Sequence, residues 1–129
     1  MTAWLKLAAR FALSLFYAVA GFYHLVSPEP FLRITPRFVP YPEMVILLTG
    51  LCEIAGAVAL HIPALRRTAG LLLALYAVCV WPANFKHAFE GIELDALPTS
   101  WWYHGPRLAL QPVLVALTLW ASDWLGKRP

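Results

Sequence analysis

Residues 44–85 read MVILLTGLCEIAGAVALHIPALRRTAGLLLALYAVCVWPANF, and this stretch decides the fold of the chain. It consists of two apolar runs, residues 44–62 and 68–85, with only residues 63–67 between them. An α-helix needs about 20 predominantly apolar residues to cross the hydrocarbon core of a bilayer. A link this short places two such helices antiparallel. The stretch therefore predicts a helical hairpin within a membrane.

Two further apolar segments flank this hairpin. We expect helices at about residues 4–26, 43–62, 68–88 and 106–125, in a single transmembrane domain that spans residues 1–129. The composition agrees, because 60% of the residues are hydrophobic and 13% are charged, against about 25% charged in soluble domains. A soluble domain of this size could not bury so much apolar surface. The predicted fold class is all-α, an integral membrane up-down bundle of four helices.

The segment between the first two predicted helices is rich in proline. Residues 27–42 hold five of the eleven prolines, and proline lacks an amide proton and fixes φ. One continuous helix is therefore excluded, although several residues of the segment are apolar. We expect an ordered loop between the first and second helices, lying at the membrane interface, with one short helical turn at residues 31–34.

The basic residues predict how the chain is oriented. An even number of helices places both termini on one side of the membrane, together with residues 63–67. That side carries six Lys and Arg residues, and the opposite side carries four. Cytoplasmic loops are enriched in these residues. We therefore expect a multi-pass protein of the inner (cytoplasmic) membrane with both termini in the cytoplasm. The net charge of +3 is then loop charge, and nucleic acid is not an expected partner.

Polar side chains inside the predicted spans are the candidate functional residues, because an ionisable group in a bilayer costs at least about 2.5 kcal/mol. The depth of each along its helix places five of them in the outer half of the bundle: His24, Glu53, Asn84, Arg107 and Gln111. They predict a polar cavity that opens outward and serves as a ligand or proton site.

Each of these residues also has a purely structural interpretation. Glu53 lies among small residues, which let helices approach closely. Its carboxylate either ties two helices together or binds a proton or ligand. His24 is alternatively an interfacial histidine bonded to backbone, and Arg107 an orientation anchor. The other histidines, His61, His87 and His104, are expected at the membrane interface on the surface.

Two prolines lie beside candidate site residues. Pro82 precedes Asn84, and Pro112 follows Gln111. A proline inside a helix leaves the carbonyl four residues earlier without its usual donor. We expect such freed carbonyls to present polar backbone to the cavity.

Cys52 and Cys79 are expected at similar depths in the hairpin. A redox pair is one hypothesis, but the sequence has no C-x-x-C motif. A cysteine in apolar surroundings usually packs as a small hydrophobic residue. No spacing of ligating residues is typical of a zinc site, so no metal is predicted.

Several motifs carry a resemblance to a known family. They are GFYHLVSPEPF at residues 21–31, ITP at 34–36, PYP at 40–42, GLCEIAG at 50–56, RRTAG at 66–70, WPANF at 81–85 and RLALQ at 107–111. In this order, and over nearly the whole chain, the sequence resembles the DoxX-like membrane proteins. The resemblance implies a bundle of four membrane helices. Members of that family are linked to quinone-coupled sulfur oxidation, redox stress complexes, maturation of disulfide-containing enzymes and, in animals, receptor assembly.

Three hypotheses for the function follow. In the first, a redox-linked membrane subunit binds a quinone or another apolar ligand; Glu53 and His24 exchange protons, while Arg107, Asn84 and Gln111 orient a carbonyl group. In the second, a non-enzymatic assembly, maturation or interaction protein contacts membrane or redox partners, or a second copy of the chain, through its proline-rich loop. The third is a small proton-coupled transporter, although small multidrug transporters carry their membrane Glu in the first helix. Whether the protein is an enzyme stays open.

Overall fold

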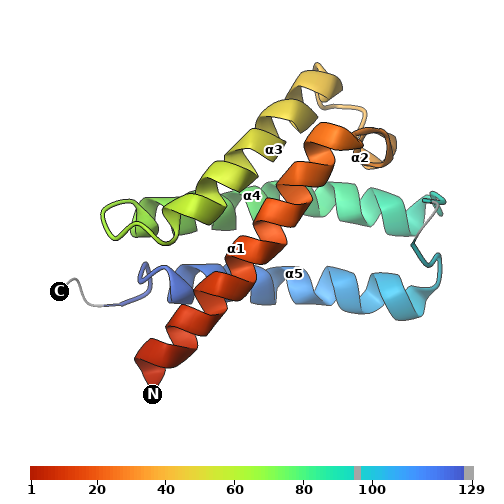
Figure 1. The fold of residues 1–129 in the computed structure, drawn as a ribbon. Helices are drawn as coiled ribbons and strands as arrows, with labels where there is room; N and C mark the ends of the chain where they lie inside the picture. Colours follow the sequence, from red (N-terminus) through yellow and green to blue (C-terminus); the bar gives the residue numbers. More distant parts are fainter. Residues whose placement is uncertain (95–96, 127–129) are drawn as a thin grey trace.

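The computed structural model describes residues 1–94 and 97–126, and all regular structure in them is helical (Figure 1). Five helices follow one another: α1 (Thr2–Val26), α2 (Glu29–Ile34), α3 (Pro42–Ala59), α4 (Arg66–Phe89) and α5 (Trp101–Ala121). The all-α prediction is therefore confirmed. By length and composition, α1, α3 and α4 are candidate membrane spans. These three helices support the prediction of a membrane protein.

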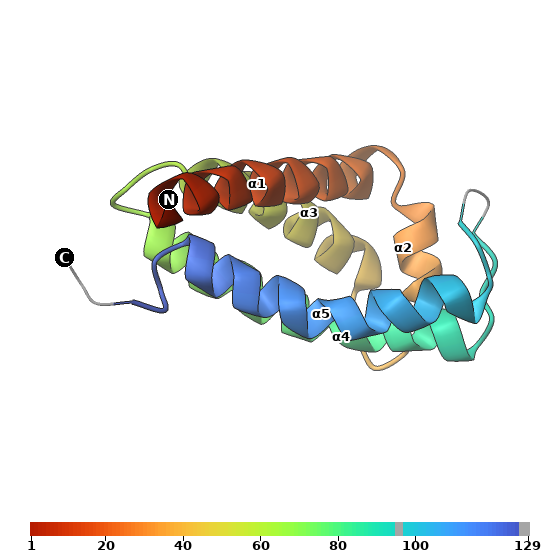
Figure 2. The same ribbon diagram turned by 90° about the horizontal axis from the view of Figure 1, so that it is seen from below.

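The long helices form two pairs. α1 packs mainly against α3, and α4 packs mainly against α5. The pairs converge near the two chain termini and diverge at the other end, where α2 lies across the gap (Figure 2). Buried apolar side chains cluster as a core: Leu13, Tyr17, Ala57, Leu60, Ala69, Leu73 and Ala121. The divergence leaves space between the pairs beside α2.

Large apolar side chains lie outside, and polar side chains lie inside. Trp4, Phe11 and Leu15 of α1 are mostly exposed. The buried polar residues are His24, Glu53, His87, His104, Gln111, Thr118 and Ser122. A water-soluble protein of this size would expose such polar groups and bury the apolar ones. This distribution suits a protein that is solvated by lipid.

The α3–α4 hairpin is present, but α3 ends earlier than expected. The helix stops at Ala59 rather than at residue 62. Beyond it, His61 N donates to Val58 O and Ile62 N donates to Ala59 O, both at 3.1 Å. Pro63 disfavours helical backbone in the residue before it, so the chain tightens into turns there.

The last helix is shifted toward the N-terminus relative to the predicted residues 106–125. It begins at Trp101, because the Ser100 side chain caps it by accepting a hydrogen bond from Trp102 N at 3.2 Å. It ends at Ala121, because Asp123 has a φ of 63°, which a right-handed helix cannot contain. α4 likewise runs to Phe89, so the loop between these helices is shorter than predicted.

The proline-rich segment contains the predicted short helix, which is α2. This helix starts at Glu29, two residues before the predicted turn at residues 31–34. Pro30 lies in its first turn, where a missing amide proton costs nothing. Lys86 Nζ of α4 donates to Thr35 O at 2.8 Å, and Arg33 donates to a carbonyl in the α4–α5 loop. These bonds hold α2 over the diverging end.

Two glycines of the α1–α3 pair, Gly21 and Gly50, face each other. A Cβ atom on Gly21 would lie 2.6 Å from Gly50 O, and one on Gly50 would lie 2.7 Å from His24 Cβ. Only residues without a Cβ permit this distance between backbones. Glu53 and His24 each lie one turn beyond a glycine of the contact, so the contact sets these two side chains next to each other.

Asp123 joins the N-terminal helix to the last one at the converging end. Its carboxylate lies 2.6 Å from Lys6 Nζ, 3.5 Å from Arg10 Nη1 and 3.6 Å from Arg66 Nη1. Burial raises the pKa of Asp123, but the hydrogen bond and charge of Lys6 and the charges of the two arginines outweigh it and hold the pKa below its usual value. Asp123 is therefore the counterion of this basic cluster at neutral pH.

The glycine contact predicts a large difference between two similar substitutions. We expect Gly21→Ala to destabilise the protein by about 1–3 kcal/mol, because its Cβ meets a backbone oxygen that cannot rotate away. The matched control is Gly105→Ala in α5, where a new Cβ meets nothing within 4 Å. Alanine favours a helix over glycine, so this control should keep or raise the thermal midpoint, measured by circular dichroism in detergent. Equal midpoints for the two variants would contradict the close approach.

Candidate functional site

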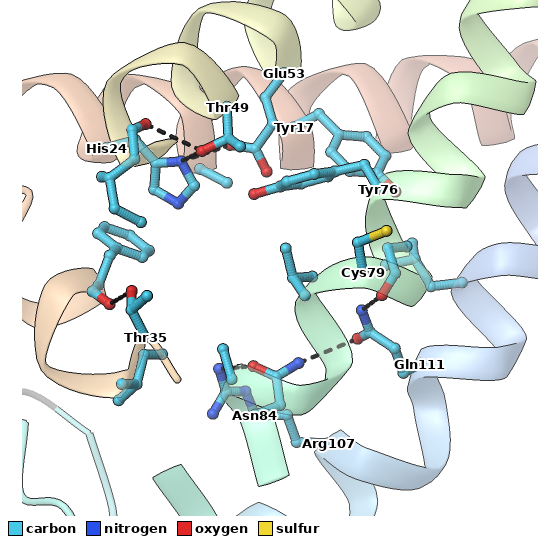
Figure 3. Close-up of a pocket in the computed structure, with 18 of the residues that line it drawn as sticks. Tyr17, His24, Thr35, Thr49, Glu53, Tyr76, Cys79, Asn84, Arg107 and Gln111 are labelled. Atoms are coloured by element: carbon cyan, nitrogen blue, oxygen red, sulfur yellow. Dashed lines mark hydrogen bonds and ion pairs between the residues drawn. The ribbon is translucent and has the colours of Figure 1, made fainter. Parts of the chain in front are cut away.

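A cavity of about 720 Å³ lies between the two helix pairs at their diverging end (Figure 3). All five helices and the segment that follows α2 contribute side chains to it, and most of these are apolar. The five predicted site residues all line this one cavity: His24, Glu53, Asn84, Arg107 and Gln111. A concave apolar site with a few convergent polar groups is typical of small-molecule binding. Ligand binding by these residues stays a prediction.

The α1–α3 side of the cavity carries a group that we call the carboxyl wall: His24, Thr49 and Glu53. His24 Nδ1 lies 3.2 Å from Glu53 Oε2 and 3.4 Å from Thr49 Oγ1. The Thr49 hydroxyl donates to Ile46 O at 3.0 Å, so its oxygen is free to accept from His24, which assigns a proton to Nδ1. The wall thus ties α1 to α3, as the structural interpretation of Glu53 expects.

Glu53 is also one of several buried side chains with an atom that forms no hydrogen bond among the described residues. Its side chain is 5% exposed, and its Oε2 atom forms no hydrogen bond of good geometry with any described residue. Buried polar atoms without partners are rare, because water is lost without compensation. The Oε2 atom is itself buried, and its close polar neighbour is His24 Nδ1 at 3.2 Å.

Two tyrosines near Glu53 were not predicted as site residues. Tyr17 and Tyr76 both line the cavity, and the phenol of Tyr76 points toward the carboxyl group of Glu53 (Figure 3). The Tyr17 hydroxyl is buried and has no hydrogen-bond partner among the described residues. Tyr17 precedes His24 by two helical turns and therefore shares its face of α1. That spacing was the signal that could have identified it.

The α4–α5 side carries a second polar group, which we call the guanidinium wall: Asn84, Arg107 and Gln111 (Figure 3). Gln111 Nε2 donates to Ala77 O at 2.7 Å, and Gln111 Oε1 accepts from Asn84 Nδ2 at 3.5 Å. Asn84 Oδ1 then accepts from Arg107 Nη2 at 2.7 Å. Each amide uses both its donor and its acceptor in this chain. Three hydrogen bonds in series therefore connect Arg107 to the main-chain carbonyl of Ala77, and they set the orientation of the guanidinium.

His87 and His104 are buried, so their predicted surface position is wrong. The two residues are 0% and 2% exposed, and their rings pack edge to face with their centres 4.7 Å apart. His87 lies in the helix that was predicted, but α5 begins at Trp101 rather than at residue 106. His104 is therefore helical, and its ring packs against His87 where α4 contacts α5. Arg107 Nη1 lies 2.8 Å from His87 Nδ1. A guanidinium only donates, so Nδ1 accepts and the ring hydrogen is on Nε2.

His61 and the two cysteines lie apart from these walls. His61 is partly buried, with Nε2 at 2.9 Å from Ser14 Oγ. Cys52 and Cys79 are both free thiols, and only Cys79 lines the cavity. A redox role for the pair stays a prediction. Among the described residues, no three His, Cys, Asp or Glu side chains gather in a way that could hold a metal ion.

The carbonyl that Pro112 frees is paired, and it does not face the cavity as predicted. Pro112 cannot donate to Leu108 O. The indole Nε1 of Trp81 donates to that oxygen instead, at 3.1 Å. Neither Leu108 nor Trp81 lines the cavity. The expected exposure of polar backbone is therefore replaced by a bond that joins α4 to α5.

This bond predicts the effect of removing one hydrogen-bond donor. Trp81→Phe keeps an aromatic ring but leaves Leu108 O without a partner, so we expect a loss of about 1–3 kcal/mol. The control is Trp4→Phe, because Trp4 is 76% exposed and should tolerate the change. Thermal unfolding in detergent measures both. A Trp81→Phe midpoint equal to that of the control would show that the bond contributes nothing.

Comparison with known proteins places the chain in a family. A family model described as "Domain of unknown function (DUF8561)" matches residues 13–122. No curated protein and no solved structure matches the chain. The matched residues include every residue that lines the cavity. Because the match covers most of its length, the chain belongs to the DUF8561 family.

Proposed function

We propose that this protein is an integral membrane protein that binds a mostly apolar small molecule with a polar head group in the cavity between its helix pairs. A quinone is one candidate. The observation that carries the proposal is a cavity of about 720 Å³ whose lining is mostly apolar but includes His24, Glu53 and Arg107. The apolar lining would bury the body of the ligand, and the two polar walls would orient its head group.

The two walls suggest how a quinone or quinol would be held. A carbonyl oxygen would accept hydrogen bonds from Arg107 on the guanidinium wall. On the carboxyl wall, Glu53 and His24 would exchange protons with a ligand hydroxyl group. Both residues line the cavity and lie 3.2 Å apart, which is close enough to share a proton. A redox-linked role rests on this pairing.

We further propose four membrane spans, with α5 as the fourth and both termini on the cytoplasmic side of the inner membrane. α5 has 21 residues. At 1.5 Å per residue its length is about 30 Å, which matches the hydrocarbon core. In support, Lys6, Arg10 and Arg66 gather at the end where the termini lie, as expected for a cytoplasmic face. Membership of the DoxX-like group, suggested by the motifs, stays a proposal.

One observation favours a second function, that of a non-enzymatic assembly, maturation or interaction protein. Phe38 and Tyr41 of the proline-rich segment are 77% and 83% exposed. Exposed aromatic side chains are frequent in contacts with partner proteins.

The transporter hypothesis requires a cavity that opens alternately to both sides of the membrane. In the assembly hypothesis, the cavity needs no ligand.

The ligand proposal predicts which substitutions remove a co-purifying molecule. We expect mass spectrometry of extracts from the purified protein to detect a native apolar molecule that Ala83→Phe and Glu53→Gln reduce about tenfold or more. The first fills the cavity, and the second removes a charged or protonatable partner. The controls are Ala109→Phe and Glu43→Gln, which make the same changes at exposed positions outside the cavity. Absence of any such ligand, together with unfolding of Glu53→Gln, would favour the assembly hypothesis.

The topology proposal predicts opposite labelling of two positions. In a background of Cys52→Ser and Cys79→Ser, single cysteines replace Glu93 in the α4–α5 loop and Arg67 at the start of α4. A membrane-impermeant maleimide added to intact spheroplasts should label the first position and not the second. Labelling of only the second would invert the orientation, and labelling of both would contradict four spans.

A further inference from the structure

Arg107 is a permanent charge on an apolar cavity wall. A guanidinium stays protonated in proteins. No described carboxylate lies within ion-pair distance of it, whereas Lys6, Arg10 and Arg66 all share Asp123. A charge in surroundings of low polarity is costly unless it has a partner of opposite sign. Arg107 therefore lacks a counterion of its own among the described residues.

The guanidinium is held in a fixed orientation. His87 Nδ1 and Asn84 Oδ1 accept from its two terminal nitrogens at 2.8 and 2.7 Å. The Tyr103 ring lies below it, with its centre 5.6 Å from Cζ. All of its partners here are neutral, and they use two of the five N–H donors of an arginine. The remaining donors have no partner among the described residues, and Arg107 lines the cavity.

The opposite wall has the reverse polarity. Glu53 and Thr49 line the cavity on that side, and their side chains carry oxygen atoms. An anionic head group would be repelled by a carboxylate there. It would be attracted by Arg107, to which it can form two parallel charge-assisted hydrogen bonds. The two walls therefore give an acidic ligand one orientation.

We infer that the cavity takes an acidic amphiphile, a molecule with a carboxylate head group that pairs with Arg107 and an apolar chain that lies along the lining. This inference rests on the proposed function, because it names the ligand class of the same cavity. It narrows that class from any polar head group to an anionic one. A neutral quinone would leave the charge of Arg107 uncompensated.

The test compares probes that share one chain and differ in head group. The full-length protein is placed in nanodiscs of phosphatidylcholine, and retention of radiolabelled dodecanoate, dodecanol and decylubiquinone is measured against empty nanodiscs. The pH is kept well above the pKa of the dodecanoate carboxyl group. We expect the wild type to retain dodecanoate about tenfold more strongly than dodecanol, since hydrogen bonds to charged groups are the stronger ones. This comparison needs no variant.

Substitutions then assign the difference to Arg107. Arg107→Gln should reduce the retention of dodecanoate about tenfold and leave that of dodecanol unchanged. Arg107→Lys keeps the charge but not the fork of donors, so it should give an intermediate value. The matched control is Arg37→Gln, at an exposed position outside the cavity. Circular dichroism of each variant verifies that the helices are intact.

The outcomes separate this inference from the proposed function. Equal retention of dodecanoate and dodecanol by the wild type would overturn the inference. So would full retention of dodecanoate by a folded Arg107→Gln. Retention of decylubiquinone without dodecanoate would overturn the inference and leave the proposed function standing. Retention of none of the three probes would overturn both.

Discussion

The backbone contact between Gly21 and Gly50 determines how closely α1 and α3 approach, and the carboxyl wall depends on that distance. With the helices further apart, His24 would not lie 3.2 Å from Glu53. The contact works without side chains, so it leaves the neighbouring positions free for polar groups. The same geometry both joins the helices and places an acid beside a base. On this side of the cavity, the glycine contact therefore determines both the packing of α1 on α3 and the distance between His24 and Glu53.

The other helix pair solves a different problem. Prolines interrupt the hydrogen bonding of α4 and α5, and lipid offers no substitute donors. At Leu108 O the missing donor is replaced by the indole of Trp81. Nearby, Gln111 anchors the amide chain on another carbonyl, that of Ala77. The indole thus compensates for the amide that Pro112 lacks, and the chain of side-chain hydrogen bonds from Gln111 gives Arg107 one orientation.

The sequence predicted the helices and much of the site, because both depend on local patterns. Long apolar runs identify spans, and a polar residue within a run, such as Glu53, is visible by its cost. The burial of His87 and His104 was not predictable in the same way. It depends on where α5 begins, which the Ser100 cap determines outside the apolar run, and on how α4 packs against α5. Which helices pair is likewise a property of shape rather than of composition.

The bonds that hold α2 have a consequence for how the protein can change over time. Lys86 donates to the main-chain oxygen of Thr35, and Arg33 to a main-chain oxygen of the next loop. Every amino acid has a main-chain oxygen, so these two hydrogen bonds do not require a particular side chain at the accepting residue. Phe31 and Ile34, which face the cavity from this cover, can therefore be exchanged while the cover stays in place. Under the proposed function, a few substitutions in this cover would change the ligand preference and leave the architecture as it is.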